Sequence, residues 1–329
     1  MSAGKLFAAM TMACALMAAP SAQAQSDYPN KPIRLVVGLA PGGLADQTAR
    51  LIAPSLSKTL GASVIVENRA GANGALAARQ VADSPPDGYT LMVVLDGTLV
   101  IGAALGNVNF DPVKDFTPIA RIIDTPMTVV ANPKLGASNI AELVALSKKQ
   151  GQKEIFYGSA GTGSSGHLVG EYLKQLTGLK MNHVPYKGAA DATSDTVSGQ
   201  IDLIISSAST TLPFVEAGTL KIVSVTGDKA LPQQPKAPLA KDSGLPELKS
   251  FNVQAWAGLV GPPNMPAPLV AKIYDAVKQA LNDPDLVSKF AVVSAQVASS
   301  TPSDFGQQIA REAKQWEQVV DKGNLKAAK

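Results

Sequence analysis

Cysteine is almost absent from this 329-residue chain, and histidine is nearly as rare. The one cysteine, Cys14, lies in an apolar N-terminal segment. The two histidines, His167 and His183, belong to no recognisable cluster of metal-ligand residues. The sequence therefore excludes an internal disulfide framework and a thiolate metal site, and we expect no bound metal.

Aromatic residues and net charge are also scarce. Phe, Trp and Tyr together make up 5% of the chain, and the formal net charge is +3. Lysine and arginine are scattered, so the sequence offers neither a basic stripe nor an aromatic platform on which bases could stack. We expect no nucleic-acid partner.

Long hydrophobic runs are lacking beyond the N-terminus. There, Lys5 precedes an apolar stretch, Leu6–Ala19, which is shorter than the roughly 20 residues that a membrane span requires. Ala22-Gln-Ala24 then supplies the small residues of a cleavage site. The pattern predicts a secretory signal peptide over residues 1–24, and hence a secreted protein that is not inserted in the membrane after cleavage.

What the chain does contain is two strand–glycine-loop–helix units, one in each half. The first runs from Ile33–Gly43 into the apolar-periodic stretch Ala45–Leu60, and the second runs from Ile155–Gly166 into His167–Leu176. A glycine loop that opens a helix exposes unpaired backbone N–H groups at the positive end of the helix dipole, which suits an anion. Two such loops facing each other across a cleft would hold a small carboxylate, which favours a binding protein over a catalyst.

Strands and helices alternate along most of the chain. This alternation favours an α/β fold of mainly parallel sheets flanked by helices. A mature chain of about 300 residues exceeds one ordinary core and indicates two domains. We expect an inserted domain over residues 126–225, within a discontinuous first domain made of residues 25–125 and 226–329. Two crossing strands would then form the hinge.

The second glycine loop also resembles two catalytic patterns. Gly161–Gly166 matches the dinucleotide-binding loop, but Met181–Gly188, where the confirming acidic residue should lie, contains no carboxylate. Ser164 and Ser165 lack the flanking glycines of a hydrolase elbow, and nothing in the sequence pairs them with a histidine and an acid. We therefore expect no cofactor and no enzymatic activity, although a secreted α/β enzyme using the same cleft stays open as an alternative.

Three further positions are candidate ligand contacts. Asp46 follows Gly43 by three residues, and bracing of the loop is favoured over direct contact with a ligand. Lys187 could supply an ammonium group to an anion or belong to a surface turn. Asp96-Gly97-Thr98 follows the third predicted strand at its carboxyl end, where ligands of open α/β sheets usually bind.

Several segments together resemble one family, the Bug-type periplasmic solute-binding proteins of the tripartite tricarboxylate transporter family. They occur in order along essentially the whole mature chain, which makes the resemblance more specific than any single loop. The segments are Tyr28–Arg34, Ala40–Asp46, Val66–Gly71, Pro86–Leu91, Asp115-Phe116, His183–Gly188 and Trp256–Gly258.

The resemblance implies a two-domain clamshell, joined by a two-strand hinge, that closes on a carboxylate-bearing ligand. It implies uptake of an organic acid with inner-membrane transporter subunits as partners; a ligand sensor for a membrane receptor is an alternative. The resemblance implies that the loops 40–46 and 159–167 hold the carboxylate of the ligand. Together with the other candidate contacts, the predicted ligand-binding residues are Leu39, Ala40, Pro41, Gly42, Gly43, Asp46, Asp96, Gly97, Thr98, Ser159, Ala160, Gly161, Thr162, Gly163, Ser164, Ser165, His167, Lys187 and Ser207.

Two departures from the family pattern bear on the ligand. Gly38-Leu39 stands where the family usually has Pro-Phe, which removes an aromatic wall. Asp96 stands where a neutral polar residue is more usual, and its negative charge would disfavour a second carboxylate nearby. A bulkier, aromatic or amino-bearing acid is therefore favoured over a small dicarboxylate.

Overall fold

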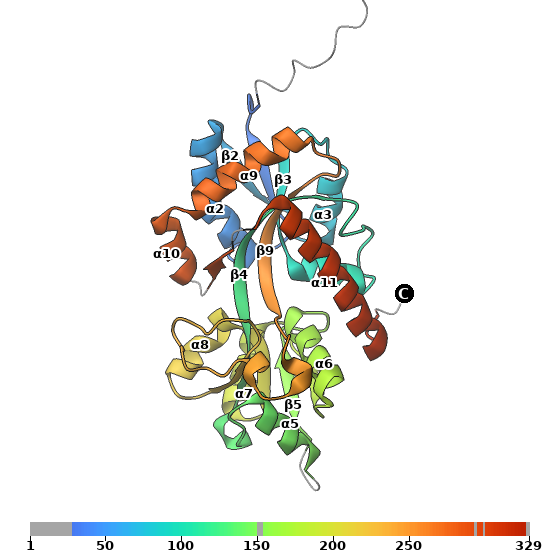
Figure 1. Cartoon of the computed structure of the whole chain (residues 1–329), viewed down its shortest axis with the longest axis vertical. Helices are drawn as coiled ribbons and strands as arrows, with labels where there is room; N and C mark the ends of the chain where they lie inside the picture. Colours follow the sequence, from blue (N-terminus) through green and yellow to red (C-terminus); the bar gives the residue numbers. More distant parts are fainter. Residues whose placement is uncertain (1–27, 150–153, 293–294, 299, 327–329) are drawn as a thin grey trace, which may run out of the picture.

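The computed structural model describes residues 28–149, 154–292, 295–298 and 300–326, and it folds into two lobes (Figure 1). Two strands, β4 (Thr117–Ala131) and β9 (Gln254–Gly261), run side by side between the lobes. The predicted signal peptide lies outside the described residues.

The first lobe is built on a mixed sheet in the order β2-β1-β3-β9-β4, with β10 on the far side of β4. β1 (Ile33–Val37), β2 (Val64–Asn68) and β3 (Thr90–Leu95) are parallel to one another. β9 is antiparallel to both of its neighbours, and β10 (Gln296–Val297) is antiparallel to β4. Because β1 and β3 are parallel neighbours, the loops that follow their carboxyl ends lie at the same edge of the sheet.

The second lobe repeats this plan with the order β6-β5-β7-β4-β8. β5 (Phe156–Ser159), β6 (Asn182–Pro185) and β7 (Leu203–Ser207) are parallel, whereas β4 is antiparallel to β7 and to β8 (Lys221–Val225). β4 is therefore a member of both sheets. The predicted α/β clamshell with a two-strand hinge is confirmed, but each sheet is mixed rather than mainly parallel, because β4 and β9 run antiparallel to the strands beside them.

The hinge lies where β4 changes partners. Pro126 is the last residue of β4 that pairs with β9, and Met127 is the first that pairs with β7. The chain that follows β8 stays with the second lobe, because Leu239 bridges to Val225 and the Phe251 ring stacks on a ring of that lobe. We propose that the inserted domain extends from residue 127 to about residue 253, further than the predicted end at 225.

Helices flank both sheets. In the first lobe these are α2 (Leu44–Leu60), α3 (Ala75–Ala82), α4 (Gly102–Ala104), α9 (Ala267–Leu281), α10 (Pro284–Val292) and α11 (Pro302–Gly323), with a π-helical turn at Gly97–Ile101 and a 3₁₀ turn at Ala72–Gly74. In the second they are α5 (Ile140–Lys148), α6 (Ser165–Thr177), α7 (Ala189–Ser198) and α8 (Ala208–Glu216), with 3₁₀ turns at Pro133–Leu135, Ala240–Asp242 and Pro246–Leu248.

Local sequence explains where the longest helices begin and end. α2 buries an apolar stripe that includes Ile52 and Leu56, and Gly61 ends it in the left-handed conformation, at a φ of 75°. α11 is capped at its start by the Thr301 side chain, which accepts a hydrogen bond from the Asp304 N–H. The apolar periodicity of 45–60 therefore predicted the bounds of α2 to within a residue.

Helix α11 connects the two lobes on one side of the hinge. Its N-terminal part packs on the first-lobe sheet, where the fully buried Phe305 ring covers Gly258 of β9. Further along, the Val319 carbonyl accepts a hydrogen bond of 2.8 Å from Gln175 of α6 in the second lobe. Any motion of one lobe against the other must therefore carry or bend this helix.

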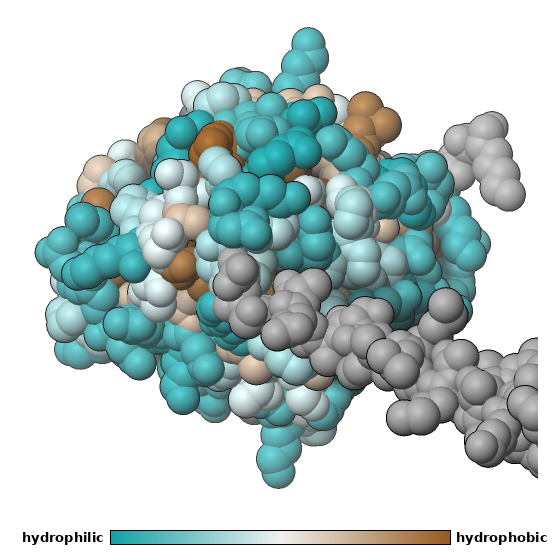
Figure 2. All heavy atoms as spheres, turned by 90° about the horizontal axis from the view of Figure 1, so that it is seen from above, coloured by the Kyte–Doolittle hydropathy of each residue, from teal (hydrophilic) through white to brown (hydrophobic). Residues whose placement is uncertain are grey.

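The outer end of the first lobe is mostly hydrophilic, with hydrophobic residues scattered singly between polar ones (Figure 2). Across the described part of the chain, no helix combines the length and the apolar character that crossing a membrane requires.

Candidate functional site

The first glycine loop links β1 to α2 at the edge of the cleft. Ala40–Gly43 are exposed, and Gly42 adopts a φ of 87°, a left-handed conformation that glycine tolerates best. The Gly42 N–H donates to the Asp46 carboxylate over 2.8 Å, so this predicted donor is already occupied. The N–H groups of Gly43 and Leu44 donate to no protein acceptor among the described residues, and they open α2.

Asp46 braces this loop from beneath. Its side chain is buried, and it accepts hydrogen bonds from Arg50 at 3.0 Å and from the Asn68 amide at 2.9 Å, besides the one from Gly42. Burial alone would raise the pKa of the Asp46 carboxyl, but the hydrogen bonds from Arg50, Gly42 and Asn68 hold it below its usual range. The carboxylate is thus engaged by three groups of the protein, and these hydrogen bonds tie the loop to α2 and β2.

The second glycine loop links β5 to α6 in the other lobe. Gly161 and Gly163 have φ values of 127° and 80°. The Gly161 N–H donates to the Ser159 hydroxyl, and the Gly163 N–H donates to Nδ1 of His167 over 3.1 Å. The two glycine N–H groups that the sequence offered as anion donors are therefore used within the loop.

The backbone N–H groups of this segment that could still bind an anion are those of Ser165 and Gly166, at the start of α6. The Ser164 hydroxyl caps the helix at the His167 N–H, which leaves the N–H groups of Ser165 and Gly166 without a protein acceptor among the described residues. A Cβ on Gly166 would lie 2.1 Å from the Ile205 carbonyl oxygen of β7. Glycine at this position lets the helix N-terminus sit directly on the sheet.

The two histidines stack beneath this loop, an arrangement that the sequence did not predict. Their ring centroids are 4.0 Å apart, and Nε2 of His183 lies 2.7 Å from the Ser159 hydroxyl. Burial, followed by the charges of His167 and Lys174, lowers the pKa of His183 to about 4, and burial also lowers the pKa of His167. Both rings are neutral at physiological pH and hold the loop by hydrogen bonds and stacking.

Asp96, which follows β3 in the first lobe, makes a direct contact with the second lobe. Its carboxylate accepts hydrogen bonds from the Ser165 hydroxyl of α6 at 3.2 Å and from the Trp256 N–H of β9 at 3.4 Å. Burial, and then the nearby Glu312 carboxyl, raise the pKa of Asp96 to about 7. A carboxyl group of this chain thus lies against the N-terminus of α6.

The remaining predicted ligand contacts discussed here, Thr98, Ser207 and Lys187, differ in burial and in their hydrogen-bond partners. Thr98 is buried and donates to the Asn73 carbonyl over 2.9 Å, next to Gly97. Ser207 occupies the N-cap position of α8 without a side-chain capping bond, and its hydroxyl lies 3.0 Å from that of Ser209, a residue that the sequence did not indicate. Lys187 is exposed beyond the end of β6, and no contact with another predicted residue is recorded within the described ranges.

The departure at Gly38 has a packing reason. A Cβ at this position would lie 2.7 Å from the Cα of Gly74, so a larger residue would push away the Gly71–Gly74 turn. That turn in turn supports Thr98, whose methyl and hydroxyl groups lie against Gly74. The lack of a side chain at Gly38 therefore allows the turn after β2 to pack closely against the end of β1.

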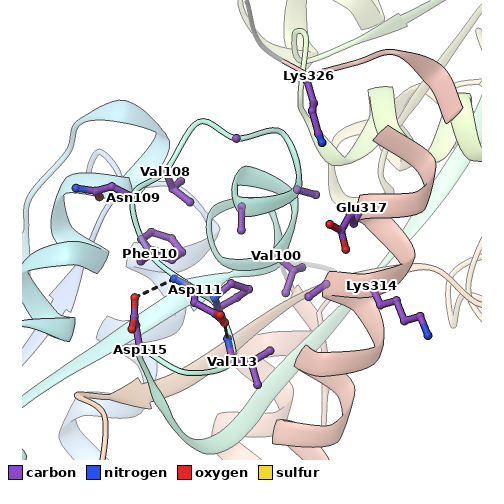
Figure 3. A pocket seen from close by; sticks show the side chains of 15 residues that line it. Val100, Val108, Asn109, Phe110, Asp111, Val113, Asp115, Lys314, Glu317 and Lys326 are labelled. Carbon is purple, nitrogen blue, oxygen red and sulfur yellow. Dashed lines mark hydrogen bonds between the residues drawn. The ribbon is translucent and has the colours of Figure 1, made fainter. Parts of the chain in front are cut away.

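Two cavities differ in their relation to these loops. One, of about 460 Å³, lies between the lobes and is lined by Leu44, Gln47, Ser209, Leu212, Pro213, Glu216, Gln233 and Val292. The larger, of about 890 Å³, lies between the segment 100–115 and α11, and contains none of the predicted contacts (Figure 3). Position between the lobes, rather than volume, decides which cavity belongs to the candidate site.

Two α/β lobes, a two-strand hinge and two helix N-termini at the cleft define the class of periplasmic binding proteins. The match to the family model of the tripartite tricarboxylate transporter family receptor covers residues 48–325. This chain belongs to that family, whose members are periplasmic solute-binding proteins.

Individual relatives agree with this assignment. A UPF0065 protein from the TAR-I ttuE-ttuC' intergenic region of Agrobacterium vitis is 36% identical over 302 residues, which are 91% of this chain and 86% of the relative. BugT from Bordetella pertussis is 30% identical over 295 residues, with 89% of each chain covered.

Two solved structures of similar proteins contain a ligand. MatC from Rhodopseudomonas palustris, with bound malate, is 32% identical at a TM-score of 0.72, covering 89% of this chain and 100% of the other. A second R. palustris protein, with adipate, is 30% identical at a TM-score of 0.72, covering 90% and 98%.

Proposed function

We propose that this chain is a periplasmic solute-binding protein that captures a carboxylate-bearing small molecule between the two glycine loops and delivers it to inner-membrane transporter subunits. The observation that supports this most strongly is a pair of helix starts, at Gly43-Leu44 in one lobe and Ser165-Gly166 in the other, whose N–H groups meet no acceptor in the described part of the chain. Both offer backbone N–H groups at the positive end of a helix dipole. Malate and adipate, bound by the two relatives, are carboxylates.

Catalysis in this cleft is disfavoured by the environment of the Ser159–His183 pair, whose hydroxyl and Nε2 lie 2.7 Å apart. Ser159 is fully buried, so its hydroxyl cannot reach a substrate carbonyl in the cleft. The lowered pKa of His183, about 4, makes its ring a weak base at neutral pH. We propose that the pair supports the loop and that the protein is not an enzyme.

Proline substitutions can test the proposed donors one lobe at a time. Gly43 has a φ of −77°, which proline accepts, and Ser165 is the first residue of α6, a favoured site for proline. Gly43→Pro and Ser165→Pro each remove one backbone N–H. Gly43→Ala and Ser165→Ala are the matched controls, because they keep that N–H.

The experiment starts with a thermal-shift screen of the mature chain, residues 25–329, against mono-, di- and aromatic carboxylates. A hydrogen bond to a charged acceptor is worth about 1.5–3 kcal/mol, so each proline variant should bind the best ligand roughly 10- to 150-fold more weakly in calorimetric titration. The alanine controls should stay within about threefold of the wild type. Equal losses in the proline and alanine variants, or no stabilising carboxylate at all, would contradict the proposal.

A further inference from the structure

We infer that the cavity between α2 and α8 receives the body of the ligand, and that it selects an uncharged or amino-bearing far end over a second carboxylate. This inference rests on the proposed function, because it takes the carboxylate to be held at the two helix starts.

The cavity begins where the proposed carboxylate site ends. Leu44, which lines it, directly follows Gly43 at the start of α2. On the opposite wall, the hydroxyl of Ser209 lies 3.0 Å from that of Ser207, at the N-cap position of α8. A ligand whose carboxylate meets the N-terminus of α2 would therefore extend from there along α8.

The lining of the cavity is apolar or neutral except at one point. Leu44, Leu212, Pro213 and Val292 supply apolar surface, whereas Gln47, Ser209 and Gln233 supply neutral polar groups. Glu216 is the one ionisable residue among the described residues of the lining.

The charges of the cavity lining determine which chemical group is favoured at the end of the ligand opposite its carboxylate. A second carboxylate would find no cation in this lining and would face the like charge of Glu216, whereas an ammonium group would find an opposite charge. The cation that follows Gln47 on α2, Arg50, is engaged by the Asp46 carboxylate at 3.0 Å. The geometry favours a monocarboxylate with an apolar body, and most of all an ω-amino acid.

The position of Glu216 makes this preference depend on ligand length. At a rise of 1.5 Å per residue, the seven steps from Ser209 to Glu216 span about 10 Å of α8. A short ligand ends before it reaches Glu216 and meets only neutral groups. The selectivity for the far end should therefore grow as the ligand lengthens.

Matched acids test this directly on the mature chain. At six, eight and ten carbons, calorimetric titration would compare the alkanoate, the ω-amino acid and the α,ω-dicarboxylate, whose six-carbon member is adipate. The 4-substituted benzoates with methyl, aminomethyl and carboxyl groups provide a rigid series. We expect the dicarboxylate to bind most weakly at each length, and the ω-amino acid to exceed it by about tenfold at ten carbons.

Variants of Glu216 identify the group responsible. Glu216→Gln should abolish the advantage of the amino end over the methyl end, and Glu216→Lys should shift the preference toward the dicarboxylate. Glu247→Gln is the control, because it removes an exposed negative charge from the same lobe outside the cavity.

The outcomes separate the two proposals. Tightest binding of the dicarboxylates, or a preference that Glu216→Lys leaves unchanged, would overturn this inference while carboxylate capture stands. Binding of no acid in either series would refute carboxylate capture itself, and this inference with it.

Discussion

Replacing Asp96 with asparagine would remove a buried carboxyl from the contact between the lobes. Its side chain is 5% exposed, and it accepts hydrogen bonds from Ser165 of one lobe and Trp256 of the hinge. Asparagine has the same shape and keeps one oxygen acceptor for these donors. The substitution therefore changes the charge while disturbing the packing little.

The size of the effect follows from the pKa of Asp96. Its folded-state value of about 7 lies above the ordinary value of 3.8, so the folded state holds the proton more tightly than the unfolded state does. Stability is then lost as pH rises from about 4 to about 7 and stays low above that range. The full difference corresponds to about 4 kcal/mol as an upper limit.

Urea unfolding at pH 5 and pH 8 provides the assay. We expect Asp96→Asn to raise the free energy of unfolding at pH 8 by a few kcal/mol, and to raise it much less at pH 5. Some pH dependence should remain in the variant, because burial also raises the pKa of Asp124, to about 6, and that of Glu312. An equal change at both pH values, or destabilisation at pH 8, would refute the reasoning.

Three further substitutions have defined outcomes. Asp46→Ala leaves the Gly42 N–H and the Arg50 guanidinium without their acceptor, and should lower the urea unfolding free energy by about 2–3 kcal/mol; an unchanged midpoint would argue against the brace. Gly163→Val places a β-branched residue at a φ of 80° with its Cβ 2.8 Å from Leu105, so titration should show at least tenfold weaker ligand binding, and wild-type affinity would count against the loop assignment. Thr301→Ala removes the cap of α11 and should cost about 1 kcal/mol in thermal unfolding, whereas Thr301→Ser should cost less.

Much of the fold was predictable because local signals agree with tertiary packing. The glycine loops, the buried strands and the cap at Thr301 each carry a pattern that needs no distant partner. The length of β4 was not predictable, because Arg121, Asp124 and Pro126 interrupt its apolar run at the hinge. α8 was also missed, since Pro213 within it suggests a break.

The candidate site was predictable as a region rather than as a set of donors. Sequence locates the loops, but it does not show that Asp46 and His167 occupy the N–H groups of Gly42 and Gly163. That pairing depends on where each side chain packs after folding. The contact between Asp96 and Ser165 joins residues 69 positions apart and carries no local signal.

A crystal structure of the mature chain with the most stabilising carboxylate would test the central claim most directly. The account predicts that the carboxylate oxygens lie within about 3 Å of backbone nitrogens from both lobes, at Gly43 or Leu44 and at Ser165 or Gly166. A ligand that contacts one lobe alone, or that occupies the larger cavity between the segment 100–115 and α11, would contradict it.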